Sequence, residues 1–144
     1  MIEICKNIYA VGAVDGDVRV FHGYQTPVGT TYNAYLVVDE RVTLIDTVKR
    51  CFADVLLEKI QAVLGERPID CIICNHAEPD HSGALPLVAK AYPSAMVYGT
   101  ASCQKALAAY YPSSQYPFVP VKNGDNLKYI PACVVALTIS FAMQ

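Results

Sequence analysis

The sequence has no cluster of basic residues. Its 11 Lys and Arg and 13 Asp and Glu give a formal net charge of -2, and like charges form no run. Because nucleic-acid phosphates are bound by clustered basic surfaces, this composition argues against a nucleic-acid partner. The chain also lacks an apolar run long enough to cross about 30 Å of bilayer, so we expect no membrane span.

The N-terminus lacks the pattern of a secretory signal peptide. Such a peptide needs a basic region followed by an apolar run, whereas this chain begins Met-Ile-Glu-Ile-Cys-Lys. We therefore expect a cytoplasmic protein.

The chain is long and apolar enough to bury a core. It has 144 residues, of which 53% are hydrophobic and 17% charged, as in an ordinary single domain. Without an export signal, we expect most of its cysteines to be reduced and buried; they are Cys5, Cys51, Cys71, Cys74, Cys103 and Cys133. Cys71 and Cys74 lie in an apolar strand pattern. Residues three apart on a strand face opposite sides, so this pair is not expected to chelate a metal.

Apolar periodicity predicts alternating strands and helices. Positions 52, 55, 56, 60, 63 and 64 recur at helical spacing and Gly65 follows as a stop, which predicts a helix over 52–64. Further helices are expected over 83–91 and 101–110. Strands are expected over 7–11, 18–21, 32–38, 42–46, 69–74, 95–98, 118–121 and 127–130, with 22–31 as a turn-rich connection. This order predicts an α/β layered domain.

A loop rich in metal-ligand side chains follows the strand over 69–74. It reads Asn-His-Ala-Glu-Pro-Asp-His-Ser-Gly and contains His76, Glu78, Asp80 and His81. Imidazole and carboxylate groups bind iron, zinc and manganese, and loops at the ends of buried strands are where such ligands converge. The alternative is a polar loop in which Asp80 or Ser82 caps the next helix and the histidines are solvated.

The same loop resembles the metal motif of the metallo-β-lactamase superfamily, specifically its flavodiiron branch. There, the hydrolase pattern His-x-His-x-Asp-His has Glu in place of the second His, as at Glu78 here. The segments 21–36 and 44–49 are also similar to that branch. The resemblance covers about residues 1–130, and it implies the N-terminal half of a metallo-β-lactamase-like αββα sandwich. Residues 131–144 form an atypical apolar tail.

The resemblance also implies a non-haem diiron centre. His76 and Glu78 would bind one iron, and Asp80 and His81 the other. Such proteins reduce dioxygen to water or nitric oxide to nitrous oxide. Their electrons come from FMN on a flavodoxin-like domain, often in the opposite subunit of a head-to-tail homodimer, and rubredoxin or a similar carrier supplies the flavin. The Glu adds a hard anionic oxygen, which favours ferric iron over zinc.

Three further residues have expected roles near this loop. By the resemblance, His22 and Tyr24 would line the pocket where the small oxidant meets the irons. The alternative for His22 is an ordinary loop histidine. We interpret Asp46 as a strand-end residue that holds the metal loop in place.

The sequence departs from the family after His81. It contains no later histidine, and Asp125, in an Asn-Gly-Asp turn, is its only later acid. The family centre needs two more histidines and a bridging aspartate, and no flavodoxin-like region is present. We therefore expect a truncated N-terminal part with weak metal affinity, no turnover alone and uncovered apolar strand faces.

Two other functions stay open. One is a zinc-dependent hydrolase of the same superfamily, against which Glu78 argues because hydrolases carry histidine there. The other is a non-catalytic fragment, either an oxygen sensor or a degenerate remnant.

Overall fold

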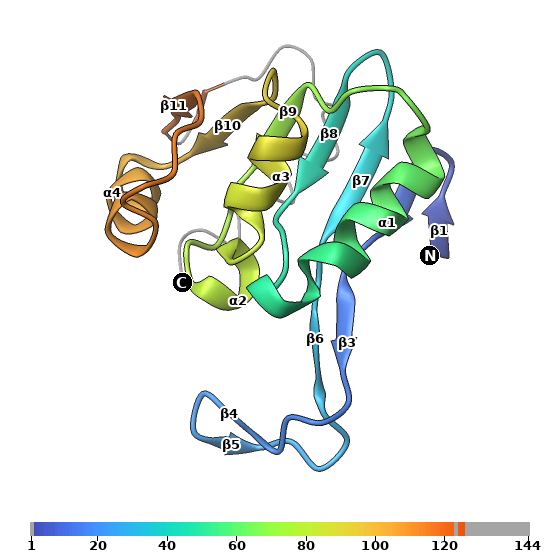
Figure 1. Cartoon of the computed structure of the whole chain (residues 1–144), viewed down its shortest axis with the longest axis vertical. Coiled ribbons are helices and arrows are strands. Elements are labelled where there is room, and N and C mark those ends of the chain that lie inside the picture. The colour runs from blue at the N-terminus through green and yellow to red at the C-terminus, as the bar shows by residue number, and fades with distance from the viewer. Residues whose placement is uncertain (1, 123, 126–144) are drawn as a thin grey trace.

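A mixed sheet of seven strands forms the centre of the computed structural model, which describes residues 2–122, 124 and 125 (Figure 1). In spatial order the strands are β1 (Ile2–Cys5), β2 (Ile8–Ala10), β7 (Tyr35–Val38), β8 (Val42–Ile45), β9 (Cys71–Ile73), β10 (Met96–Gly99) and β11 (Phe118–Pro120). Neighbours from β1 to β8 pair antiparallel, and those from β8 to β11 pair parallel. The expected α/β class is confirmed.

Helices connect the parallel strands across one face of the sheet. They are α1 (Ala53–Leu64), which follows the short 3₁₀ turn η1 (Arg50–Phe52), α3 (Leu85–Ala91), which follows the short α2 (Pro79–Ser82), and α4 (Ala101–Tyr110). Right-handed crossovers that advance in one direction place their helices on one face. Accordingly, one core contains both helix and strand residues, among them Leu56, Leu85, Leu107, Leu44, Ile72 and Val97. This two-layer unit is one half of an αββα sandwich.

The opposite face of the sheet is also apolar. Val37 and Ile73 lie at its middle with Ile8 and Ile45 packed against them. Val37 is 2% and Ile73 6% exposed, so these two side chains are buried.

A two-stranded arm leaves the sheet between β2 and β7. β3 (Ala13–Asp15) pairs with β6 (Thr30–Tyr32), and the hairpin of β4 (Val20–Phe21) and β5 (Tyr24–Gln25) lies at the far end of the arm (Figure 1). Tyr32 packs the base of the arm against Phe52 of η1, with ring centroids 5.6 Å apart. Its ring is fully buried, and its Oη donates a hydrogen bond to Asp15 Oδ2 at 2.9 Å. Burial and this hydrogen bond raise the pKa of Tyr32 to about 12.

The arm was not predicted from the sequence. The expected strand over 18–21 shrinks to β4, and the stretch 22–31, expected as turns, contains β5 and the start of β6. The expected strand over 32–38 is divided between β6 and β7. Strands of two or three residues are too short to show apolar alternation, so periodicity cannot detect them.

Two helix expectations need correction. The helix expected over 83–91 begins at Leu85. Gly83 lies between α2 and α3, where its Cα packs closely against the backbone of Pro79 and Arg50. Helix α1 is confirmed, but its Val55 is 38% exposed, and the buried stripe is Ala53, Leu56, Ile60 and Leu64.

The cysteines divide into exposed and buried groups. Cys71, Cys74 and Cys103 are buried and free as expected, whereas Cys5 and Cys51 are exposed. Cys5 lies on the outer strand β1 and Cys51 in η1. Cys74 belongs to the helix-side core and Cys71 does not, which confirms that the two face opposite sides.

The expected strand over 127–130, Cys133 and the tail over 131–144 lie outside the described residues. Within the described part of the chain, none of the helices has the length and apolarity that a bilayer crossing requires.

We predict that Tyr32→Phe flattens the loss of stability at alkaline pH. The unfolded tyrosine ionises near its ordinary pKa of 10.0 and the folded one near 12, so the stabilisation is full below pH 10 and is lost as pH rises through 12. The loss is on the order of 2 kcal/mol in the free energy of unfolding. Urea unfolding between these pH values measures it. Tyr110→Phe, at a tyrosine 48% exposed, is the control and should keep the wild-type slope.

Candidate metal centre

The metal loop begins where two parallel strands end side by side. Ile45 of β8 pairs with Ile73 of β9, so Asp46 and Asn75 leave the same edge of the sheet. The Asp46 carboxylate accepts hydrogen bonds from Asn75 N at 2.7 Å, Asn75 Nδ2 at 3.2 Å and His76 N at 3.2 Å. Burial raises the pKa of Asp46, although these hydrogen bonds oppose the shift. The interpretation of Asp46 as the residue that holds the loop is confirmed.

The C-terminal part of the loop is held by a second set of bonds. Thr47 donates to the His81 carbonyl through its N at 2.9 Å and its Oγ1 at 2.6 Å. Ser82 Oγ donates to the Ala77 carbonyl at 2.6 Å and lies 2.9 Å from Tyr111 Oη. Neither α2 nor α3 has a side-chain N-cap, so the expectation that Asp80 or Ser82 caps a helix is wrong. Ser82 bonds to the backbone of the loop instead.

The four predicted ligands form two neighbouring pairs. His76 Nε2 lies 3.4 Å from Glu78 Oε2, and His81 Nε2 lies 3.5 Å from Asp80 Oδ2. The rings of His76 and His81 have centroids 5.3 Å apart. The first pair is about half exposed, and the second is more buried, with Asp80 at 12%. The division of these residues between two metal positions, which the resemblance implies, stays a prediction.

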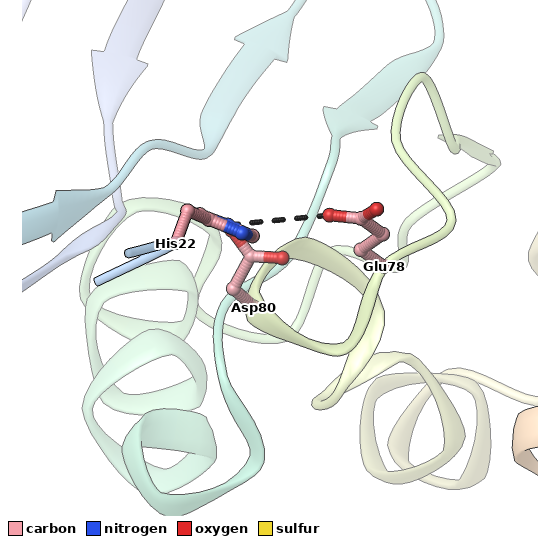
Figure 2. Close-up of side chains that lie close together, drawn as sticks. All are labelled: His22, Glu78 and Asp80. Carbon is pink, nitrogen blue, oxygen red and sulfur yellow. Dashed lines mark ion pairs between the residues drawn. The ribbon is translucent and has the colours of Figure 1, made fainter. Parts of the chain in front are cut away.

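The arm places His22 beside Glu78 and Asp80 of the metal loop (Figure 2). His22 and Gly23 form the two-residue turn between β4 and β5, with φ of 49° and 81°, as a type I′ turn requires. The Phe21 ring packs edge-on against the His22 ring at 4.2 Å between centroids. His22 Nε2 consequently lies 3.7 Å from Asp80 Oδ2 and 4.0 Å from Glu78 Oε2.

His22, Glu78 and Asp80 thus form a group whose potential ligand atoms lie within 4.8 Å of one another. The sequence identified His22 only as a pocket-lining residue and did not predict this approach. A His-Gly pair between two short strands is a turn signal, but nothing local indicates which loop the turn will reach.

Tyr24 and Asp125 are not members of this group. Tyr24 is 77% exposed on β5, and its role in lining a pocket stays a prediction. Asp125 is a turn residue, as expected: its Oδ2 accepts a hydrogen bond from Lys122 N at 2.9 Å, beside Gly124 at φ 89°.

The donor chemistry fits a first-row metal centre. Imidazole nitrogens and carboxylate oxygens converge from the loop and the arm, and these ion pairs involve neither lysine nor arginine. His81 Nδ1 is buried without a hydrogen-bond partner in the described part of the chain. A buried polar atom left without a partner is rare in native folds and is relieved by a metal or a water. These residues therefore suit iron or a similar ion.

Comparison with known proteins gives a consistent family. Residues 30–138 match the family described as ODP family beta lactamase. The chain is 40% identical over 126 residues to rubredoxin-oxygen oxidoreductase of Megalodesulfovibrio gigas, covering 87% of this chain and 31% of that protein. It is 38% identical over 128 residues to nitric oxide reductase of Moorella thermoacetica, covering 88% and 32%.

Solved structures show the same fold. The crystal structure of the flavodiiron protein from Giardia intestinalis has a TM-score of 0.82 and 36% sequence identity, covering 88% of this chain and 31% of that one. The chain therefore spans about a third of the length of the proteins it matches.

We predict that Asp46→Ala destabilises the chain more than Asp46→Asn. Alanine leaves the donors of Asn75 and His76 without an acceptor, which costs about 1–3 kcal/mol in the free energy of unfolding. Asparagine keeps one carbonyl oxygen and tolerates the left-handed φ of 55°. Urea unfolding of both variants measures how much free energy of unfolding each one loses. Equal losses in the two variants would contradict the anchoring role.

We predict that Gly83→Ala disrupts the junction between α2 and α3. An added Cβ would lie 2.5 Å from Pro79 O and 2.6 Å from Arg50 N, both of them backbone atoms. Relieving such overpacking typically costs about 1–3 kcal/mol. Gly16→Ala, where an added Cβ meets nothing within 4 Å, is the control. Thermal unfolding should separate the two variants, and similar midpoints would refute the steric argument.

Proposed function

The chain belongs to the ODP family of beta lactamases, and on that premise we propose that it supplies part of the diiron centre of a flavodiiron reductase. The proposed reaction is reduction of dioxygen to water or of nitric oxide to nitrous oxide. In support, the similar proteins are named as a rubredoxin-oxygen oxidoreductase and a nitric oxide reductase.

The position of Glu78 carries this proposal. Its Oε2 lies 3.4 Å from His76 Nε2 and 4.0 Å from His22 Nε2, so a carboxylate oxygen stands among imidazoles. A metallo-β-lactamase hydrolase would place a third neutral nitrogen here. A hard anionic oxygen instead stabilises ferric iron and moves the preference away from zinc.

In this proposal the side chains of the loop would bind two iron ions, two residues to each. His76 and Glu78 hold one iron, and Asp80 and His81 hold the other. When bound, the iron pair supplies redox chemistry to a small oxidant. His22 Nε2 faces both carboxylates, and this contact restrains their orientation. The His22 side chain is also proposed to line the oxidant pocket. Tyr24 is proposed to line that pocket as well.

The remaining components are proposed to lie outside the described residues. FMN would be carried on a flavodoxin-like domain and reduced by rubredoxin or a similar carrier, in a head-to-tail homodimer in the cytoplasm. The further metal ligands would also come from elsewhere. Residues 1–130 are proposed as the partial metal domain and 131–144 as a separate tail, so these 144 residues alone would bind iron weakly and show no turnover.

We predict that the chain, loaded anaerobically with excess ferrous iron and passed through a desalting column, retains part of that iron, measured as metal content by mass spectrometry. Glu78→Ala and Asp80→Ala should each lower iron retention by about tenfold or more, because even partners that only support metal ligands contribute that much. Glu66→Ala, at an exposed acid beyond α1, is the matched control and should leave retention unchanged.

Glu78→His recreates the hydrolase pattern and should shift retention from iron toward zinc. Preferential zinc retention by the unaltered chain, together with esterase activity, would reject the reductase and favour the hydrolase.

A further inference from the structure

Two buried thiols lie directly behind the metal loop. Cys74 follows β9 and is 5% exposed, and Cys103 lies in the first turn of α4 and is 7% exposed. The two thiols interact, and this interaction raises the pKa of Cys74 and lowers that of Cys103. Cys103 Sγ also donates to the Cys74 carbonyl at 3.7 Å, and Cys74 Sγ donates to the His76 carbonyl at 3.4 Å. The thiol pair therefore connects α4 to the first residues of the loop.

Local backbone features create this approach. A Cβ added at Gly99 would lie 3.1 Å from Cys103 Sγ and 3.2 Å from Cys74 O, so only glycine leaves full room for the thiol. Thr100 Oγ1 accepts a hydrogen bond from Cys103 N at 3.1 Å, which fixes Cys103 at the N-terminus of α4. The positive end of a helix dipole stabilises a thiolate there, and thiolates are the reactive form of cysteine.

We propose that Cys74 and Cys103 are a reversible oxidation site that forms a disulfide with hydrogen peroxide as oxidant. Cys103 sulfur attacks one peroxide oxygen, the O–O bond breaks, and a sulfenic acid and one water result. Cys74 sulfur then attacks the sulfenic sulfur, the S–O bond breaks, and a second water leaves. The two thiols lose two electrons and the peroxide gains them; a dithiol reductant reverses the reaction.

Oxidation changes the support of the metal loop. The Cys74 thiol proton, now donated to the His76 carbonyl, leaves with the water, so this carbonyl loses its donor. This inference goes beyond the proposed function and needs no metal for its chemistry.

The other described cysteines cannot substitute for either partner. Cys71 faces the opposite side of β9, outside the helix-side core that contains both thiols. Cys5 and Cys51 are exposed at the strand edge and in η1. The geometry therefore selects one pair.

The test uses the whole chain, treated with equimolar hydrogen peroxide, blocked with an alkylating reagent and mapped by tryptic mass spectrometry. Lys90 separates the peptides that contain Cys74 and Cys103, and fragmentation between Cys71 and Cys74 assigns the linked cysteine within residues 60–90. We expect the 74–103 link in about tenfold excess over any other pair, reversed by a dithiol. Cys71→Ser is the matched control and should retain the link, whereas Cys103→Ser should lose it.

Three outcomes would overturn the proposal. Cys74 and Cys103 could stay alkylated while Cys5 or Cys51 is oxidised. The link could vanish in Cys71→Ser, which would assign it to Cys71. It could also form equally in concentrated urea, which would show that the fold does not select it. The main measurement is made on the unaltered chain, whose folding is checked by circular dichroism. The test therefore still gives a result if one of the variants misfolds.

Discussion

The Asp46 carboxylate accepts hydrogen bonds from Asn75 N at 2.7 Å and His76 N at 3.2 Å, and these bonds join the ends of β8 and β9. The rest of the centre depends on this junction. It orients the first residues of the loop, and the Thr47 bonds to the His81 carbonyl orient the last. A short loop held at both ends presents its ligand side chains with little freedom, which favours a preformed site.

The arm supplies the second constraint on the centre. Tyr32 packs against Phe52 at 5.6 Å between ring centroids and against Phe21 at 6.0 Å, and Phe21 packs against His22. This row of aromatic rings extends from the buried base of the arm to the imidazole at its end. A hairpin of two-residue strands has little stability of its own, so these contacts place His22 beside Glu78 and Asp80.

Local sequence patterns predicted the features with local physical causes. Helix α1 follows from apolar spacing with Gly65 as its stop, and α4 is confirmed over 101–110. The ligand loop was identified because its side chains are adjacent in the sequence. The arm strands escaped prediction because each is only two or three residues long and because β3 pairs with β6 across distant positions, such as Ala13 and Tyr32. The boundary at Gly83 likewise depends on contact with Arg50 N.

The sequence by itself therefore determined the α/β class, the main helices and the choice of candidate metal-ligand side chains, because each arises from neighbours along the chain. Only the tertiary structure decided that His22 joins Glu78 and Asp80, and that Cys103 meets Cys74 rather than Cys71. Strand pairing and helix crossover bring distant residues together. Their register is fixed by packing of the whole sheet, which no single segment encodes.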